Sequence, residues 1–363
     1  MLRPPLLIII DNLAKGGAEI MLVDLLPELK NVYEIILVTL ADKCDFEEQK
    51  IVCDHLYALG FKNKVSFIPC IFRLNKIIKK HKPALIHSHL IYSGIIARMA
   101  CPSSIPLLYS IHGELSKSDF NKSQVLSLME KISIRKNHSL LAVSNVVLED
   151  YQKTIRKIYR SFVLHNYISD DYLIQNISPK TFVGLASLRL IAVGNIKAAK
   201  NYQYLVESFK YLKDLPVTLD VYGNTDHPLF TGLQAEIDRL KLNIVFRGSS
   251  SSIRNQFREH DVFVMCSKNE GFGISVIEAM ACGLPVLLSD IPVMREISFQ
   301  NGLFFNPKNP LSFVDLIKEI LEGKNNLNEL SINGLSISKK YNKKQYLERL
   351  LSLYDELIIE CHN

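Results

Sequence analysis

The most informative segment of the chain is Cys266-Ser-Lys-Asn-Glu-Gly-Phe-Gly-Ile-Ser-Val-Ile-Glu-Ala-Met-Ala-Cys-Gly-Leu-Pro-Val286. The apolar run at 261–266 predicts a buried strand, and residues 274–282 have the apolar spacing of a helix. The two glycines between them permit a tight turn, and Gly283 with the following proline ends the helix before a further strand. The sequence therefore predicts a strand, a glycine turn, a helix and a second strand in close succession.

This arrangement favours an anion site with a carboxylate on each side. A helix that begins just past the carboxyl end of a strand directs free N–H groups at whatever lies there, and phosphate is the commonest ligand. Glu270 precedes the helix, whereas Glu278 lies inside it, about 6 Å along the axis from Ile274 at 1.5 Å per residue. A nucleotide sugar has hydroxyls on both sides of a diphosphate, so the spacing suits it.

The same block closely resembles the Glu-x7-Glu signature of glycosyltransferase family 4, also called glycosyl transferases group 1. This is the largest family of retaining glycosyltransferases with the two-domain GT-B fold, and it continues Glu-Gly-Phe-Gly into Glu-Ala-Met-Ala-x-Gly-x-Pro-Val, which stands here at 278–286. The resemblance covers nearly the whole chain, strongly over 188–300 and more weakly before. It implies an α/β fold of two doubly wound, Rossmann-like domains that face each other across a cleft.

Chain length and patterning agree with two domains. At 363 residues the chain is too long for one ordinary core and suits two domains of about 150–180 residues. Strand-like runs alternate with amphipathic helical stretches, which predicts parallel sheets wrapped by helices. The expected strands are 6–10, 34–38, 84–87, 107–111, 140–143 and 162–164 in the first half, and 188–194, 218–222, 244–246, 261–266, 285–288 and 302–305 in the second.

The resemblance assigns a role to each domain. Residues 1–175 would form the domain on the acceptor side, and residues 176–340 the domain that binds the nucleotide-sugar donor. The helix expected at 341–363 would pack back on the first domain, as the last helix does in similar proteins.

Composition indicates a folded protein of the cytoplasm. Hydrophobic residues make up 48% and charged residues 22%, as in globular domains. No apolar run approaches the roughly 20 residues needed to span a bilayer, and the first ten residues are too short for a signal peptide. The seven cysteines form no Cys-x-x-Cys pair, which favours reduced thiols over disulfides or zinc.

The net charge of +6 is unevenly distributed. Residues 62–82 contain seven lysines and arginines and no acid, and a second basic region runs from Lys131 to Arg160. Such stretches are either solvated helix faces or a surface for anionic lipid or a pyrophosphate-linked acceptor. The second alternative predicts peripheral association with the inner face of the membrane. We do not expect a nucleic-acid partner, because stacking aromatic residues do not alternate with the basic ones.

The loop after strand 188–194 carries the expected diphosphate contacts. The family usually has Gly-Arg-Leu here followed by Lys-Gly, and its arginine and lysine bind the donor diphosphate. Lys200 matches the lysine, whereas Asn195 replaces the arginine. A neutral amide offers hydrogen bonds without full charge compensation, so this departure bears on donor affinity rather than on fold. An ordinary surface lysine is the alternative for Lys200.

The resemblance also assigns the remaining donor contacts. Glu270 would hold hydroxyls of the transferred sugar, and Glu278 the ribose hydroxyls. Lys200 and the helix dipole would stabilise the departing nucleoside diphosphate. No Asp-x-Asp triad occurs, which removes the usual metal anchor of the other major transferase fold, so we expect neither a metal nor another cofactor. Main-chain groups would face the diphosphate and the base at Gly271, Phe272, Gly273, Ile274 and Arg247.

The first half contributes a glycine loop and three histidines. Gly16 and Gly17 follow the first strand and resemble the family's loop that faces the donor sugar and phosphate, although a plain turn is the alternative. His112 follows the strand at 107–111 and precedes a glycine, which matches the family's histidine near the reacting centre; a structural histidine is the alternative. His87 and His89 end another strand, and alternation places them on one face, near the acceptor. A metal site there would need a third ligand, which the sequence does not show.

The sequence therefore predicts a metal-independent, retaining glycosyltransferase. It would move a sugar from a nucleoside-diphosphate donor, UDP rather than GDP, to a glycan acceptor linked to lipid, in assembly of a surface polysaccharide or glycoconjugate. A nucleotide-sugar epimerase or phosphorylase on the same architecture is the enzymatic alternative. A non-catalytic partner subunit is the other alternative, supported by Asn195 alone. The absence of a Gly-x-Gly-x-x-Gly fingerprint argues against an oxidoreductase.

Overall fold

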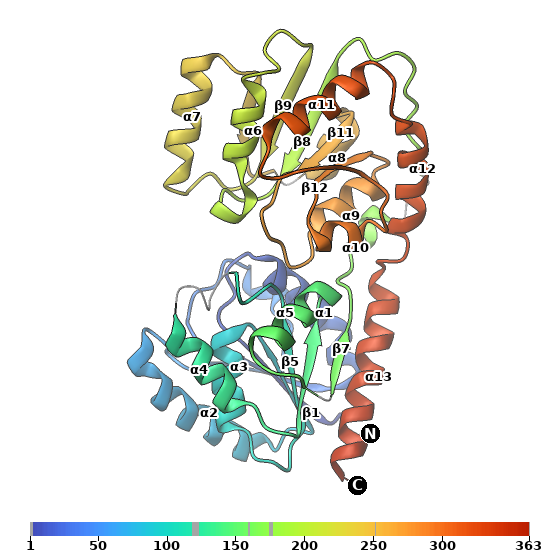
Figure 1. Cartoon of the computed structure of the whole chain (residues 1–363). Coiled ribbons are helices and arrows are strands. Elements are labelled where there is room, and N and C mark those ends of the chain that lie inside the picture. The colour runs from blue at the N-terminus through green and yellow to red at the C-terminus, as the bar shows by residue number, and fades with distance from the viewer. Residues whose placement is uncertain (1–2, 118–122, 159, 174–176, 251, 363) are drawn as a thin grey trace. The chain divides into compact units, whose positions relative to one another are not determined.

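A computed structural model describes residues 3–117, 123–158, 160–173, 177–250 and 252–362 of the chain (Figure 1). The chain forms two compact units. The first contains Met1–His165 together with Lys344–Asn363, and the second contains Asn166–Lys343. The boundary expected between 175 and 176 lies outside the described residues.

The first unit is built on a parallel sheet of seven strands in the order β3-β2-β1-β4-β5-β6-β7. The order reverses direction between β1 and β4, which is where open α/β sheets bind ligands, outside the carboxyl ends of their strands. The strands are β1 (Pro5–Ile10), β2 (Glu34–Thr39), β3 (His55–Ala58), β4 (Leu85–His89), β5 (Leu107–Ile111), β6 (His138–Ala142) and β7 (Ser161–Val163).

Right-handed crossovers distribute the helices of this unit over both faces of the sheet. One face carries α2 (Phe67–His81), α3 (Ile91–Ala100), α4 (Gln124–Ser133) and α5 (Asn145–Thr154). The other carries α1 (Gly17–Val32) and α13 (Lys343–His362), whose Tyr354 ring meets Tyr33 edge to face at 5.9 Å. The C-terminal helix thus packs on the first unit, where Figure 1 shows it in red.

The second unit has a parallel sheet of six strands in the order β10-β9-β8-β11-β12-β13, with its switch point between β8 and β11. Its strands are β8 (Leu188–Val193), β9 (Val217–Tyr222), β10 (Ile244–Gly248), β11 (Val262–Met265), β12 (Val286–Ser289) and β13 (Leu303–Phe305). One layer of helices contains α6 (Tyr202–Phe209), α7 (Leu229–Leu240) and α11 (Pro310–Leu321), and the other contains α8 (Ile253–Glu259), α9 (Ile274–Ala281), α10 (Pro292–Ile297) and α12 (Leu327–Ser338).

The alternation of strands and helices predicted from the sequence is confirmed, and all twelve expected strands are present with small shifts at their ends. The sequence prediction missed β3. This strand is four residues long, lies at the edge of the sheet and has no fully buried residue, so it lacks the apolar run that identifies a central strand. Of the helices in the described part of the chain, none combines the length and the apolar character needed to cross a bilayer.

Candidate active site

In the second unit the two side chains assigned to catalysis meet at the switch point. Lys200 ends the short helix η4 (Ala198–Lys200) after β8, and Glu270 follows β11. The Nζ atom of Lys200 lies 2.6 Å from Oε2 of Glu270, and both side chains are about one-fifth exposed. The sequence places these residues 70 positions apart, but parallel strands bring their loops to one edge of the sheet.

Backbone contacts hold the two loops together. Lys268 N donates to Ala199 O at 2.8 Å, and Cys266 Sγ donates to the carbonyl of Lys200 at 3.0 Å. Ser267 Oγ donates weakly to Glu270 at 3.4 Å. Burial raises the pKa of the Cys266 thiol to about 12, so this sulfur remains a neutral donor. The loops that carry Lys200 and Glu270 are therefore joined by neutral hydrogen bonds, and Ser267 shares with Lys200 the Oε2 atom of Glu270.

Two glycines permit the close approach of these loops. A Cβ atom at Gly223 would lie 2.3 Å from the carbonyl oxygen of Gly194, and one at Gly194 would lie 2.9 Å from Cε of Lys200. The Tyr202 hydroxyl donates to Gly194 O at 2.7 Å and fixes the turn. The glycines thus leave room for the lysine stem to lie across the strand end.

Asn195 has a structural task in this loop. Its Oδ1 atom accepts from the backbone N–H of Asn224 at 2.9 Å, which ties the loop after β8 to the loop after β9. The residue itself is exposed. The oxygen of its amide therefore braces the loop.

The amino end of α9 has the geometry predicted from its glycines. Gly273 caps the helix at a φ of +90°, in the left-handed region that favours glycine, and Ile274 is the first helical residue. The Phe272 side chain is 3% exposed and packs edge to face on Tyr341 at 5.6 Å, so it belongs to the core. Only main-chain groups of Gly271 and Phe272 can therefore serve a ligand.

Glu278 lies within α9 in an environment that disfavours its charge. The residue is half-buried, and desolvation raises the pKa of its carboxyl to about 7. The carboxylate in turn contributes to raising the pKa of Tyr172, after burial of that phenol. Hydrogen bonds accepted by a carboxyl of this kind would stabilise its ionised form.

Arg247 lies on β10 at a bulge, where the register with β9 shifts between Phe246 and Gly248. Its Nε atom donates to Oδ1 of Asp220 at 3.0 Å, and Nε2 of His260 approaches the other carboxylate oxygen at 3.2 Å. The Arg247 side chain is therefore held by Asp220 within the same unit, and its main chain is the part that the bulge presents at the strand end.

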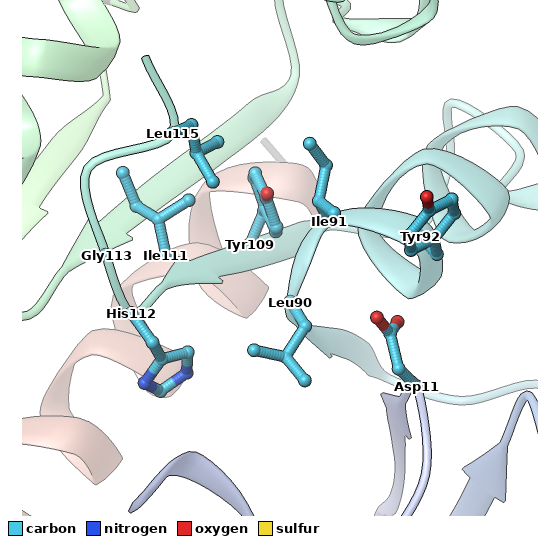
Figure 2. A pocket seen from close by; sticks show the side chains of 9 residues that line it. All are labelled: Asp11, Leu90, Ile91, Tyr92, Tyr109, Ile111, His112, Gly113 and Leu115. Carbon is cyan, nitrogen blue, oxygen red and sulfur yellow. The ribbon is translucent and has the colours of Figure 1, made fainter. Parts of the chain in front are cut away.

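The first unit has a pocket at its own switch point, with a cavity volume of about 280 Å³ (Figure 2). It combines an apolar and aromatic wall with one imidazole and one carboxylate. Arg98 stacks on the outer face of one wall residue, Tyr109, at 4.5 Å, which fixes that ring. The lining residues are Asp11, Leu90, Ile91, Tyr92, Tyr109, Ile111, His112, Gly113 and Leu115.

Leu90 and Asp11 shape one side of this pocket. Leu90 precedes α3 at φ +69° and ψ 170°, a region that residues other than glycine rarely adopt, and such strain is concentrated at functional sites. Oδ1 of Asp11 accepts from the backbone N–H of Ser93 at 2.7 Å, which joins the end of β1 to the first turn of α3. Gly16 and Gly17 follow in the same loop, as the cap and first residue of α1.

His112 lines the pocket, and the other two histidines lie behind it. Nε2 of His112 is 3.2 Å from Nδ1 of His89, and the His89 ring lies 4.1 Å from that of His87. The ring nitrogens of His87 contact the Tyr354 hydroxyl at 2.5 Å and Ser110 Oγ at 2.7 Å. Burial lowers the pKa of His112 to about 4, so its imidazole is neutral at physiological pH.

His87 and His89, which were expected near the acceptor, are buried within the first sheet. They are 2% and 4% exposed and neither lines the pocket, because β4 is a central strand with all five residues buried. Asp11, Leu90 and Tyr92 also line the pocket and were not predicted from the sequence. Asp11 could have been found from its place directly after β1. The positive φ of Leu90 could not, because a leucine in the sequence does not indicate such a conformation.

Comparisons with known proteins identify the family of the chain. The model of the family described as "Glycosyl transferases group 1" matches residues 175–336, and that of "Glycosyltransferase Family 4" matches residues 15–171. An uncharacterized glycosyltransferase of Methanocaldococcus jannaschii is 23% identical over 94% of this chain and 95% of its own length. The UDP-Gal:alpha-D-GlcNAc-diphosphoundecaprenol alpha-1,3-galactosyltransferase of Escherichia coli is 24% identical over 80% of this chain and 79% of its own.

Solved structures share the fold over the whole chain. The structure of Anabaena HepE in complex with UDP aligns with a TM-score of 0.81 at 17% identity, covering 97% of this chain and all of the other. The two doubly wound units are thus those of the GT-B fold. Between them the two family models match nearly the whole chain, which therefore belongs to the family 4, group 1 glycosyltransferases.

Proposed function

We propose that this glycosyltransferase transfers a sugar from a UDP-sugar to a lipid-linked glycan acceptor, with retention of the anomeric configuration and without a metal ion. The observation that carries the proposal is the Lys200–Glu270 pair beside the amino end of α9, at the switch point of the second sheet. It presents one cation, one carboxylate and the main-chain N–H groups of a helix start at a single place, which is the chemistry that a sugar diphosphate requires.

Binding of the donor would break the ion pair between Lys200 and Glu270. A diphosphate carries about two negative charges, so the Lys200 ammonium would turn from Glu270 to the phosphate oxygens, and the N–H groups at Gly273 and Ile274 would complete their solvation. Glu270 would then accept from hydroxyls of the sugar, and Glu278 from those of the ribose. Asn195, braced through its oxygen, would donate its amide nitrogen where other family members have an arginine.

The pocket of the first unit supports a role for His112 in positioning rather than in proton transfer. Its imidazole is neutral and its Nε2 atom is engaged by His89. A neutral imidazole can hydrogen-bond a sugar hydroxyl without adding charge. We propose that the departing diphosphate, stabilised by Lys200 and α9, takes the acceptor proton during retaining transfer.

The E. coli relative supports the choice of donor and acceptor, because its printed name specifies UDP-galactose and a diphosphoundecaprenol-linked sugar. The surface of the first unit supports a lipid-linked acceptor independently. On α2, Ile68 and Phe72 are 65% and 67% exposed and share their face with Lys76 and Lys79. On α4, Val125, Leu128 and Ile132 are likewise exposed beside Lys131.

Exposed apolar residues flanked by lysines are typical of helices that lie at the interface of an anionic membrane. Helices α2 and α4 both pack on α3 and therefore belong to one layer of the first unit. We propose that this layer binds the inner face of the membrane. Flotation with vesicles of anionic lipid tests it: Phe72→Ser should reduce binding, whereas Leu229→Ser, which alters an exposed apolar residue of the second unit, should not.

The experiment that tests the catalytic proposal is a measurement of nucleoside diphosphate released from UDP-, GDP- and ADP-sugars in the presence of EDTA, with and without a lipid extract. We expect release from one UDP-sugar, stimulated by the extract, and an unchanged anomeric configuration in the product by NMR. Release from a GDP-sugar alone would overturn the choice of nucleotide, and an inverted product would overturn retention. A free epimerised sugar without acceptor would favour the epimerase alternative.

A further inference from the structure

A cluster of side chains that can bind a metal lies at the amino ends of strands in the first sheet, whereas the pocket lies at the carboxyl ends. Glu34 and His55 are the first residues of β2 and β3, and His81 is the last residue of α2. Within the described part of the chain, this is the group of three whose ligand atoms all lie within 4.8 Å of one another.

The sheet register explains why Glu34 and His55 meet. His55 pairs with Ile36, so its side chain shares a face with Ile36 and with Glu34 two positions earlier on the same strand. Tyr57 pairs with Val38 and projects from the same face of β3. The end of α2 brings His81 onto this face, where its ring centroid lies 4.5 Å from that of His55.

The distances approach those of a coordination sphere. Nε2 of His55 is 3.1 Å from Oε1 of Glu34. Two ligand atoms of a tetrahedral zinc ion, with bonds of about 2.0–2.1 Å, are separated by about 3.3 Å. The His55–Glu34 edge therefore needs almost no change. The ligand atom of His81 lies within 4.8 Å of the other two, so it needs a shift of at most about 1.5 Å, which a partly exposed side chain can make by a small rotation.

A second layer of contacts orients the third ligand. The Tyr57 hydroxyl lies 2.9 Å from Nε2 of His81, and Nζ of Lys80 donates to the same hydroxyl at 3.0 Å. A ligating histidine commonly uses its other ring nitrogen for such an orienting bond. Lys80 is exposed, so it can withdraw, but its charge opposes a bound cation.

We propose that Glu34, His55 and His81 bind a divalent transition-metal ion, with zinc the best fit to two imidazoles and one carboxylate. Water completes the tetrahedron, since the cluster is partly open to solvent. The ion ties the edge strand β3 to β2 and to the end of α2. Its role is structural, because its ligands lie at the end of the sheet away from His112.

The test is titration of the purified, reduced protein with Zn²⁺ by calorimetry, and with Co²⁺ by visible absorption. We expect one equivalent to bind, with the absorption of tetrahedral Co²⁺ and no thiolate charge-transfer band. His55→Gln and His81→Gln should each weaken binding at least about 100-fold, and Tyr57→Phe about 10-fold. The control His227→Gln removes a histidine of the second unit and should leave binding unchanged.

Two further variants keep the proposal open to refutation if a histidine variant folds poorly. Glu34→Gln retains the size of the side chain and should weaken binding, whereas Lys80→Met removes the opposing charge and should tighten it a few-fold. A hundredfold excess of Zn²⁺ over its Kd should raise the unfolding midpoint of the wild type by about 5 °C or more, reversibly with EDTA. Binding that is the same in wild type, His55→Gln and His81→Gln, or a thiolate band, would overturn the assignment.

Discussion

Lys200→Met separates a donor-binding role for the lysine from a purely structural one. In the free protein the Lys200 ammonium pairs with Glu270 at 2.6 Å, and methionine keeps the apolar stem that lies against Gly194 while it removes the charge. If the lysine binds the diphosphate, the variant loses its interaction with the donor. If the pair only joins two loops, the variant loses stability and nothing else.

The structure gives different magnitudes for the two effects. Both side chains are about one-fifth exposed, so breaking the pair should cost about 1 kcal/mol of stability, or about 2–4 °C in Tm for a unit of this size. Hydrogen bonds to charged groups contribute about 1.5–3 kcal/mol each. The loss of one of them to a diphosphate, about 1.5–3 kcal/mol, corresponds to about 10- to 150-fold in UDP affinity and in kcat/KM.

The assay combines calorimetric titration with UDP, thermal unfolding and turnover of the preferred UDP-sugar. Arg189→Met is the matched control, because Arg189 on β8 pairs with Asp261 at 3.1 Å in the same unit but at the amino ends of the strands. It should lose a similar amount of stability and no UDP affinity. A Lys200→Met protein that unfolds earlier but binds UDP within about twofold of wild type would refute the donor-binding role.

Three further predictions follow from individual contacts. The carboxyl of Glu278 has a pKa of about 7 in the folded protein, above its unfolded value, so its contribution to stability is full below about pH 4.5 and is lost as the pH rises through 7. In thermal unfolding at pH 8, Glu278→Gln should therefore be more stable than the wild type. UDP binding near pH 7 should release a proton in the wild type only, which calorimetry in buffers of different ionisation enthalpy measures. Tyr354→Phe removes the hydrogen bond to buried His87 and should lower the free energy of unfolding in urea by about 1–3 kcal/mol. It should also reduce kcat more than KM. An unchanged kcat would show that the contact of α13 with His87 has no role in turnover. Gly273→Ala forces a Cβ to 3.0 Å from Cε of Met294 at a φ of +90° and should cost about 1–2 kcal/mol of stability and weaken UDP binding, whereas alanine at Gly232, which meets no atom within 4 Å, should do neither.

The local signals of the sequence determined the fold class and much of the donor loop. Apolar runs bounded by glycine and proline identified every central strand, because a strand buried on both faces must be continuously hydrophobic. The turn before α9 could also be predicted, since a helix cap at positive φ favours glycine and Gly273 occupies that position. β3 was missed because an exposed edge strand is under no such constraint.

Which side chains lie together depends on the tertiary structure. The Lys200–Glu270 pair, the bracing of Asn195 by Asn224 and the contact of Tyr354 with His87 join residues far apart in the chain, and their distances depend on strand order and register. The same holds for Glu34, His55 and His81, which no spacing in the sequence relates. Burial also depends on the tertiary structure. Alternation correctly placed His87 and His89 on one face, but both are buried because β4 is a central strand. The position of a strand in its sheet depends on neighbouring strands that its own sequence does not specify.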